Sequence, residues 1–194
     1  WCRSCVAGRG ESDWHKELTH DAAKPTDSTD YCFMGKRVDI DTADEHTIPI
    51  CVHRCSMDRW ITAHPVRRKG PEEWIVETCA QDLKDWGYAS LIYKSDQEPA
   101  ILALKVAVIK RARELCKDPE GAIYFKDIQC EESGVGESQS NSIVERAIWE
   151  VEGLTRTLVN ATEAMHGLKL EASHPIRLWA IEYSAQLLKR FDKN

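Results

Sequence analysis

Three acidic residues stand at the edges of expected secondary-structure elements, where folding can bring distant side chains together. Asp30 opens an apolar, aromatic stretch that predicts a strand over 30–34, and Asp96 follows an apolar run at 89–93. Glu145 lies in the first turns of the next-to-last expected helix. If the two strands are neighbours, Asp30 and Asp96 come close, and a helix packed across the sheet brings Glu145 to the same point.

Three converging carboxylates would form a site of hard oxygen ligands, which Mg²⁺ and Mn²⁺ prefer. Two such ions can activate an attacking oxygen and stabilise a leaving oxygen in phosphoryl transfer. Each residue also has a plainer interpretation, because Asp96 is typical of a helix N-cap, Asp30 of a surface position and Glu145 of a solvated helix residue. The metal hypothesis therefore depends on the three positions jointly.

The elements that must position these residues follow from apolar periodicity. Their expected order is β-β-β-α-β-α-β-α-α, in which three adjacent strands predict an antiparallel meander and the later strands predict parallel additions. The predicted fold class is α/β, a mixed five-stranded sheet with helices on its faces. Strands are expected at 30–34, 48–52, 60–64, 89–93 and 122–125, and helices at 71–86, 98–116, 138–158 and 176–191.

Bulk composition limits the classes of protein. The chain has 194 residues and 42% hydrophobic content, which suits one globular domain with a sizeable core. No apolar run reaches the length of a membrane span, and no signal-peptide pattern opens the chain. Since it starts without Met, we interpret it as a piece of something longer. Its eight irregularly placed cysteines indicate a reducing compartment, not a disulfide framework.

The net charge of −6 argues weakly against a broad nucleic-acid surface, because phosphate binding relies on Lys and Arg. Two basic clusters, 67–69 and 110–113, keep local phosphate binding possible. We expect Lys105, Lys110 and Arg113 to lie on the exposed side of the helix over 98–116, where they would hold backbone phosphates.

Three sequence blocks carry a resemblance to a known family. They are STDYCFM at 28–34, KSDQEPA at 94–100 and ESQSNSIVER at 137–146. Over about residues 27–192 the chain resembles the catalytic core of integrases from retroviruses and long-terminal-repeat retrotransposons, and looks closest to divergent retrotransposon polyproteins. The third block is the most specific, because it is similar to the family's QSNG-x-VER block.

The resemblance implies a ribonuclease-H-like fold and a polynucleotidyl transferase that processes DNA ends and joins them into target DNA. By this resemblance Asp30, Asp96 and Glu145 are the catalytic triad and bind Mg²⁺ or Mn²⁺. A loop before the Glu lies near the DNA end in the family, so that Gln139, Ser140 and Asn141 would touch DNA, although a polar helix entry explains them equally well. Homo-oligomers and an intracellular, nuclear place of action are also implied.

The chain departs from the family pattern at several positions. Ser142 stands where the family has Gly, and the long interval between the second and third acids predicts an insertion near 117–134. Asp27 is a rival for the first acid and Glu137 for the third. These departures and the acidic balance leave two alternatives open: a catalytically silent module that binds DNA or protein, and a nuclease that cuts without joining.

Cysteines suggest a second kind of metal site. Cys2 and Cys5 have the spacing of half a zinc site. In the family a His-His-Cys-Cys zinc domain precedes the core, so residues 1–26 would be a linker or the end of that region and 27–194 the core. His15 and His20 offer another completion, and two free thiols are the plainer interpretation.

A second cysteine pattern, Cys51-x-His53-x-Cys55, lies in an expected strand. All three side chains would point to one face of that strand. At this spacing they are too spread to chelate one ion easily, so we interpret the group as part of the core.

Overall fold

The structure, a computed structural model, describes residues 24–34, 48–58, 60–116, 127–133, 141–171 and 173–191. Several sequence expectations fall outside these ranges: the N-terminal cysteines and histidines, the strand at 122–125, Glu137, Gln139 and Ser140.

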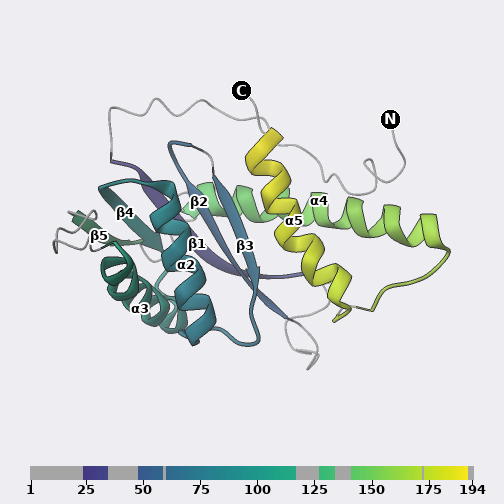
Figure 1. The fold of residues 1–194 in the computed structure, drawn as a ribbon, viewed down its shortest axis with the longest axis horizontal. Coiled ribbons are helices and arrows are strands. Elements are labelled where there is room, and N and C mark those ends of the chain that lie inside the picture. Colours follow the sequence, from purple (N-terminus) through teal and green to yellow (C-terminus); the bar gives the residue numbers. More distant parts are fainter. Residues whose placement is uncertain are drawn as a thin grey trace.

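The described ranges form one five-stranded sheet in the order β3-β2-β1-β4-β5. The first three strands pair antiparallel, while β4 pairs parallel with β1 and β5 parallel with β4 (Figure 1). The predicted meander with parallel additions is therefore confirmed. The strands are β1 (Thr26–Phe33), β2 (Pro49–Cys55), β3 (Ile61–Pro65), β4 (Ser90–Ser95) and β5 (Asp127–Glu132).

The last described strand, β5, was not expected from the apolar pattern, and the strand expected at 122–125 lies outside the described residues. β5 has the sequence DIQCEE, in which Ile128 alone is buried. An edge strand has a neighbour on one side only, so polar side chains can occupy most of its positions. The alternation that marks a half-buried strand is therefore missing from this segment.

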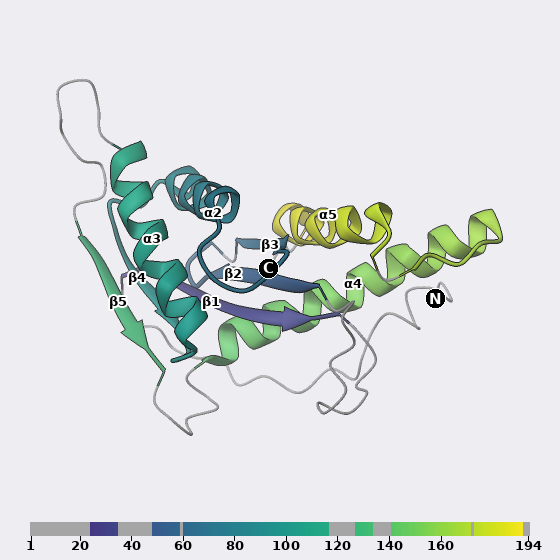
Figure 2. The ribbon, with the colours of Figure 1, turned by 90° about the horizontal axis from the view of Figure 1, so that it is seen from below.

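Helices cover both faces of the sheet, as predicted. Figure 2 shows α2 and α3 on one side and α4 on the other, and α5 packs along β3 and against α4. Gly87 and Gly167 end α2 and α4 with φ of 73° and 62°, a conformation that glycine adopts without steric cost. The helices are α2 (Glu73–Trp86), α3 (Pro99–Leu115), α4 (Ser142–His166) and α5 (Pro175–Phe191). None of these helices combines the length and apolar content that a bilayer crossing requires.

Alternation along the strands divides the core into two layers. Ile50 and Val52 of β2 pack with α4 and α5, as the predicted common face requires. Cys51 and Cys55, on the opposite face of β2, pack with α2 and α3. Successive side chains of β1 also point to opposite faces, so neighbouring residues of this strand meet different helices.

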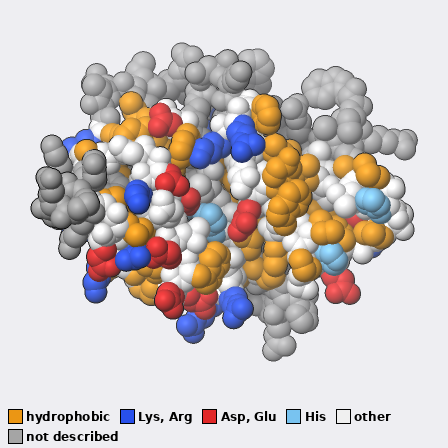
Figure 3. Space-filling view, viewed as in Figure 1, with side chains coloured by type: hydrophobic (Ala, Val, Ile, Leu, Met, Phe, Trp, Pro, Cys, Tyr) orange, Lys and Arg blue, Asp and Glu red, His pale blue; other side chains and the backbone are white. Residues whose placement is uncertain are grey.

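The exposed side of α5 carries apolar side chains. Trp179 is 57% exposed and stacks on Tyr183 with ring centroids 4.6 Å apart. Ile176 and Phe191 are also exposed on this helix. In Figure 3 hydrophobic side chains gather over the position of α5.

The junction between α4 and α5 is held by a buried carboxylate. Glu163 accepts hydrogen bonds from Lys169 Nζ at 2.7 Å, from the backbone N–H of Leu170 at 2.9 Å and from Arg177 Nη2 at 3.3 Å. The bond from Lys169, followed by that from Leu170, lowers the pKa of Glu163 to about 2.

We predict that Glu163→Gln lowers the thermal midpoint near neutral pH, because it removes the charge that these donors share. Since the folded pKa lies below the ordinary value of 4.5, the stabilisation is present above pH 4.5 and is lost as the pH falls toward 2. Thermal unfolding followed by circular dichroism should therefore show the two proteins converging in acid. Glu171→Gln, at an exposed position, is the control, and an equal effect from that variant would contradict the assignment.

Candidate functional site

The parallel pairing of β1 with β4 brings two acidic residues to the same part of the sheet. The register places Thr29 beside Ser95. Asp30 directly follows Thr29 in the chain, and Asp96 directly follows Ser95. The charge of Asp96 contributes to raising the pKa of Asp30. The condition on which the sequence argument depended, that these two strands are neighbours, is met.

Asp30 is half-buried on the face of the sheet that α4 covers. Its Oδ1 accepts the backbone N–H of Tyr31 at 2.7 Å, and its Oδ2 accepts Asn141 Nδ2 at 3.4 Å. Burial raises the pKa of Asp30 to about 6, and the charges of Asp96 and Glu98 act in the same direction. The carboxyl group therefore ionises less readily than an exposed aspartate.

Asp96 contacts the segment that leads into α3 and lies close to Asp30. Its Oδ1 accepts the backbone N–H of Glu98 at 3.1 Å, so that it satisfies a free amide just before α3. Its charge is also among the causes that raise the pKa of Asp30. The N-cap residue of α3 is Glu98 and has no side-chain cap, so the interpretation of Asp96 as the helix cap is wrong, whereas its charge does act on Asp30.

The N-terminus of α4 reaches the same place. Asn141, which immediately precedes α4, is buried and contacts Asp30, while Glu145 lies exposed in the first turn. The carboxylates of Asp30, Asp96 and Glu145 do not form a group with all ligand atoms within 4.8 Å of one another; across the described ranges that spacing is met by a different set. The structure thus brings Asn141 to Asp30 and leaves Glu145 at the surface.

Sequence reasoning missed the ion pair of Glu98 and Lys69 at this site, because it assigned Glu98 to a helix start and Lys69 to a basic cluster. The charge of Glu98 contributes to raising the pKa of Asp30. Both carboxylate oxygens of Glu98 accept hydrogen bonds from Lys69 Nζ, Oε2 at 2.7 Å and Oε1 at 2.9 Å. The Lys69 ammonium also lies 5.4 Å from the ring centroid of Tyr31, whose hydroxyl accepts the N–H of Gly70. The basic loop is thereby tied to β1. The sequence offered one sign of a role for Glu98, its place two residues after Asp96, but the start of a helix explained this acidic residue equally well.

Lys105 is a correction to the sequence analysis. We expected it on the exposed basic side of its helix, but it is 2% exposed. Its Nζ donates to Ser95 Oγ at 3.1 Å and to the carbonyl oxygen of Glu131 at 2.9 Å. Ser95 Oγ in turn donates to the carbonyl of Asp96, so Lys105 supports the segment that carries this acid. Burial lowers the pKa of Lys105.

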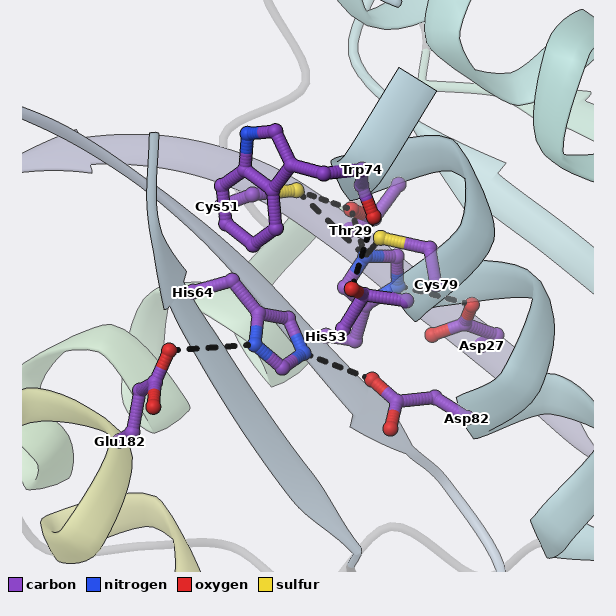
Figure 4. A network of polar contacts seen from close by, with 10 residues as sticks. Asp27, Thr29, Cys51, His53, His64, Trp74, Cys79, Asp82 and Glu182 are labelled. Carbon is purple, nitrogen blue, oxygen red and sulfur yellow. Dashed lines mark hydrogen bonds and ion pairs between the residues drawn. The ribbon is translucent and has the colours of Figure 1, made fainter. Parts of the chain in front are cut away.

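Asp27, the rival for the first acid, occupies a different environment. Alternation along β1 places it on the face toward α2, opposite to Asp30. It is 1% exposed, and its Oδ2 lies 3.1 Å from His53 Nδ1 (Figure 4). Its second oxygen, Oδ1, has no hydrogen-bond partner.

Beyond His53 the same network contains two sulfurs. His53 Nε2 lies 3.4 Å from Cys51 Sγ and 3.2 Å from Cys79 Sγ. In the described part of the chain, these three residues are the group whose potential ligand atoms all lie within 4.8 Å of one another. The interpretation of the Cys-x-His-x-Cys pattern as ordinary core is therefore incomplete. Cys79 of α2 takes the place that the sequence pattern assigned to Cys55.

Charges within this buried network are coupled. Burial lowers the pKa of His53, but the charges of Asp27 and Cys51 outweigh it and raise the pKa well above its usual range. The hydrogen bond from Cys79 and the charge of His53 lower the pKa of the Cys51 thiol against the effect of burial. The contacts within this network thus shift the pKa values of Cys51 and His53 in opposite directions.

Comparison with known proteins supports the fold. No protein-family model and no curated protein sequence matches the chain. A chain in the cryo-electron-microscopy structure of the simian T-cell lymphotropic virus intasome in complex with PP2A regulatory subunit B56 gamma matches with a TM-score of 0.50 and 14% identity, over 92% of this chain and 56% of that one. The HTLV-2 integrase catalytic core domain, in complex with magnesium and in dimeric form, matches with a TM-score of 0.50 and 14% identity, over 86% of both chains. The chain thus has the fold of a retroviral integrase catalytic core and spans 56% of the intasome chain.

We predict that Lys105→Ala lowers the free energy of unfolding by about 2 kcal/mol, because it leaves the Glu131 carbonyl without its donor and opens space in the core. Chemical denaturation measures this change. The exposed Lys110→Ala on the same helix should stay within about 0.5 kcal/mol of wild type. Equal effects from the two variants would show that Lys105 is not a buried support.

Proposed function

We propose that this chain, with its integrase-core fold, is a metal-dependent polynucleotidyl transferase that processes retroelement DNA ends and joins them into target DNA. The observation that carries the proposal is the meeting of Asp30, Asp96 and the N-terminus of α4 at one place on the sheet. In this proposal residues 27–194 are the catalytic core, and 1–26 are the end of a preceding zinc-binding region. Such an enzyme would act in the nucleus, where the target DNA lies.

The residues present fit a divalent cation. Asp30, Asp96 and Glu145 offer only carboxylate oxygens, the donors that Mg²⁺ and Mn²⁺ prefer. Asp30 is also unfavourably placed as an anion, since burial and its acidic neighbours oppose its charge. Bound divalent cations would supply activation of the attacking oxygen and stabilisation of the leaving oxygen.

The chain's own residues have separate roles in this proposal. Asn141 holds the Asp30 carboxylate through Oδ2, and Lys105 supports the segment before Asp96 through Ser95. Glu145, in the first turn of the helix that Asn141 precedes, supplies the third carboxylate.

Contacts to DNA would come from basic side chains of the loop before α2 and of α3, and from amide side chains before α4. Arg67 and Arg68 are exposed in the loop that Lys69 ties to Glu98, and Lys110 and Arg113 are exposed on α3. These side chains can hold backbone phosphates without reading sequence. Gln139 and Ser140 directly precede Asn141 in the chain, and we retain both as candidate DNA contacts.

The apolar surface of α5 supports a homo-oligomer. Trp179 and Phe191 are 57% and 72% exposed, and aromatic side chains are enriched at the buried centres of protein interfaces. One structure with the same fold is a dimeric integrase core. A second copy of this chain is the partner we propose for α5.

A catalytically silent module is the second candidate. It is favoured by the exposed position of Glu145 outside a tight carboxylate group, and by Ser142 at the start of α4. Clustered carboxylates repel one another without a cation, so an open arrangement is equally expected of a competent metal-free site. Metal binding and product formation separate the two candidates.

We predict that the purified chain, with Mn²⁺ and a labelled duplex that mimics a retroelement end, yields strand-transfer products. Asp96→Asn and Glu145→Gln should each reduce product at least about 100-fold, because each removes a proposed metal ligand. Asp85→Asn, at an exposed position on α2, should retain activity. Transfer that survives Asp96→Asn would overturn the assignment, and cleavage without joined product would identify a nuclease instead.

We also predict that Asp30→Asn raises the free energy of unfolding of the metal-free chain near neutral pH by about 1 kcal/mol. The folded pKa of about 6 exceeds the ordinary 3.8, so ionisation of Asp30 destabilises the fold as the pH rises between these values. Thermal unfolding of the wild type and of Asp30→Asn measures this difference in stability. The dependence of the thermal midpoint on Mg²⁺ or Mn²⁺ tests whether the carboxylates bind a cation.

Added cation should raise the thermal midpoint of the wild type and of Asp85→Asn, but not that of Asp30→Asn. A wild type that shows no shift at millimolar Mn²⁺ would favour the silent module.

A further inference from the structure

We call the place where Asp30, Asp96 and the N-terminus of α4 meet the acidic edge. The buried cluster of Cys51, His53 and Cys79 lies on the other face of the sheet. The first two residues come from β2 and the third from α2, and all three are at most 1% exposed. Figure 4 shows the two sulfurs and the imidazole directed toward one another, with Thr29 of β1 beside them. No described element other than these brings thiols to this point.

Distances within the cluster match those of a tetrahedral zinc site. Ligand distances of about 2.3 Å for sulfur and about 2.0–2.1 Å for imidazole nitrogen place the two ligand atoms about 3.6 Å apart at a tetrahedral angle. His53 Nε2 lies 3.4 Å from Cys51 Sγ and 3.2 Å from Cys79 Sγ. Small side-chain movements would therefore complete the geometry.

Thr29 stands where a fourth ligand belongs. An oxygen ligand at about 2.1 Å would lie about 3.4 Å from the nitrogen and about 3.6 Å from a sulfur in the same geometry. Thr29 Oγ1 lies 3.5 Å from His53 Nε2 and 3.9 Å from Cys51 Sγ. Its hydroxyl closes the side of the cluster that faces β1.

Asp27 provides an independent observation. Its Oδ2 lies 3.1 Å from His53 Nδ1, so that it can accept the imidazole N–H and leave Nε2 free to bind a metal. Metal-ligating histidines commonly hold such a carboxylate on their other nitrogen. A fully buried aspartate is costly in an apolar core, and positive charge beside His53 would offset that cost.

We propose that Cys51, His53 and Cys79 bind one Zn²⁺ ion inside the core, with the Thr29 hydroxyl at the fourth corner and Asp27 as a positioning residue for His53. Two thiolates and one imidazole are soft and intermediate donors that favour zinc over the hard cations suited to the acidic edge. Burial excludes solvent and substrate, so the ion would be structural. It would join β2, α2 and β1 at Thr29, the residue before Asp30, on the face of the sheet opposite to the Asp30 side chain. The site does not depend on the proposed function.

The test uses the full 194-residue chain carrying Cys2→Ser and Cys5→Ser, so that the N-terminal cysteines cannot contribute zinc. The chain is expressed with added zinc, purified in the presence of a phosphine reductant and desalted. Its zinc content is then measured by inductively coupled plasma mass spectrometry. We expect about one zinc per chain, in agreement with a single closed site. Cobalt substitution should give visible bands of a tetrahedral ion and a thiolate charge-transfer band.

Variants assign the ligands. Cys51→Ser and Cys79→Ser should each reduce bound zinc at least tenfold. Cys55→Ser, another buried cysteine on the same face of β2, should leave it unchanged. Asp27→Asn should weaken zinc affinity about 10- to 100-fold while the cobalt spectrum keeps two thiolates, because it acts through His53.

The parent chain keeps the proposal falsifiable even where a variant fails to fold. X-ray absorption at the zinc edge should report two sulfur neighbours per ion. A folded parent chain that binds no zinc, a cobalt spectrum without thiolate bands, or a Cys51–Cys79 disulfide in the purified protein would each overturn the site. Because no DNA is present, these outcomes are distinct from failure of the strand-transfer assay.

Discussion

The parallel pairing of β1 with β4 is the constraint on which the rest of the structure depends. Its register sets Thr29 beside Ser95, so that the residues after them, both aspartates, follow at the same part of the sheet. The same pairing lets α3 cover β4 with Lys105 underneath, bonded to Ser95. A one-residue slip would turn the side chains of β1 to the other face and would separate Asp30 from α4.

Strict alternation along β1 gives this strand two different chemical faces. Asp30 looks toward α4 and meets Asn141, whereas Asp27 and Thr29 look toward α2 and meet His53. One face is partly open and carboxylate-rich, and the other is closed and contains two thiols. Hard and soft cations would therefore be sorted by the two sides of a single strand.

Three buried charged side chains in the described ranges lie against hydrogen-bond partners. Lys105 donates to a hydroxyl and a carbonyl, Glu163 accepts from three donors, and one oxygen of Asp27 is hydrogen-bonded to His53 Nδ1. Such groups cost free energy to bury, and their hydrogen bonds offset part of that cost. Asp30 differs, because two of its neighbours carry the same sign of charge. The acidic edge therefore differs from the rest of the interior in its excess of negative charge around Asp30.

The sequence by itself determined the order of elements, the mixed sheet and the common face of Ile50 and Val52, because residue periodicity records which side of each element is buried. It also marked Asp30, which opens an apolar stretch, and Asp96, which follows one. Only the tertiary structure decided that Asn141 touches Asp30, that Lys105 points inward and that Cys79 joins His53. Contacts between segments far apart in the chain depend on strand order, register and helix placement, and local patterns do not carry this information. β5 illustrates the same limit, since a polar edge strand is defined by its neighbour and not by its own alternation.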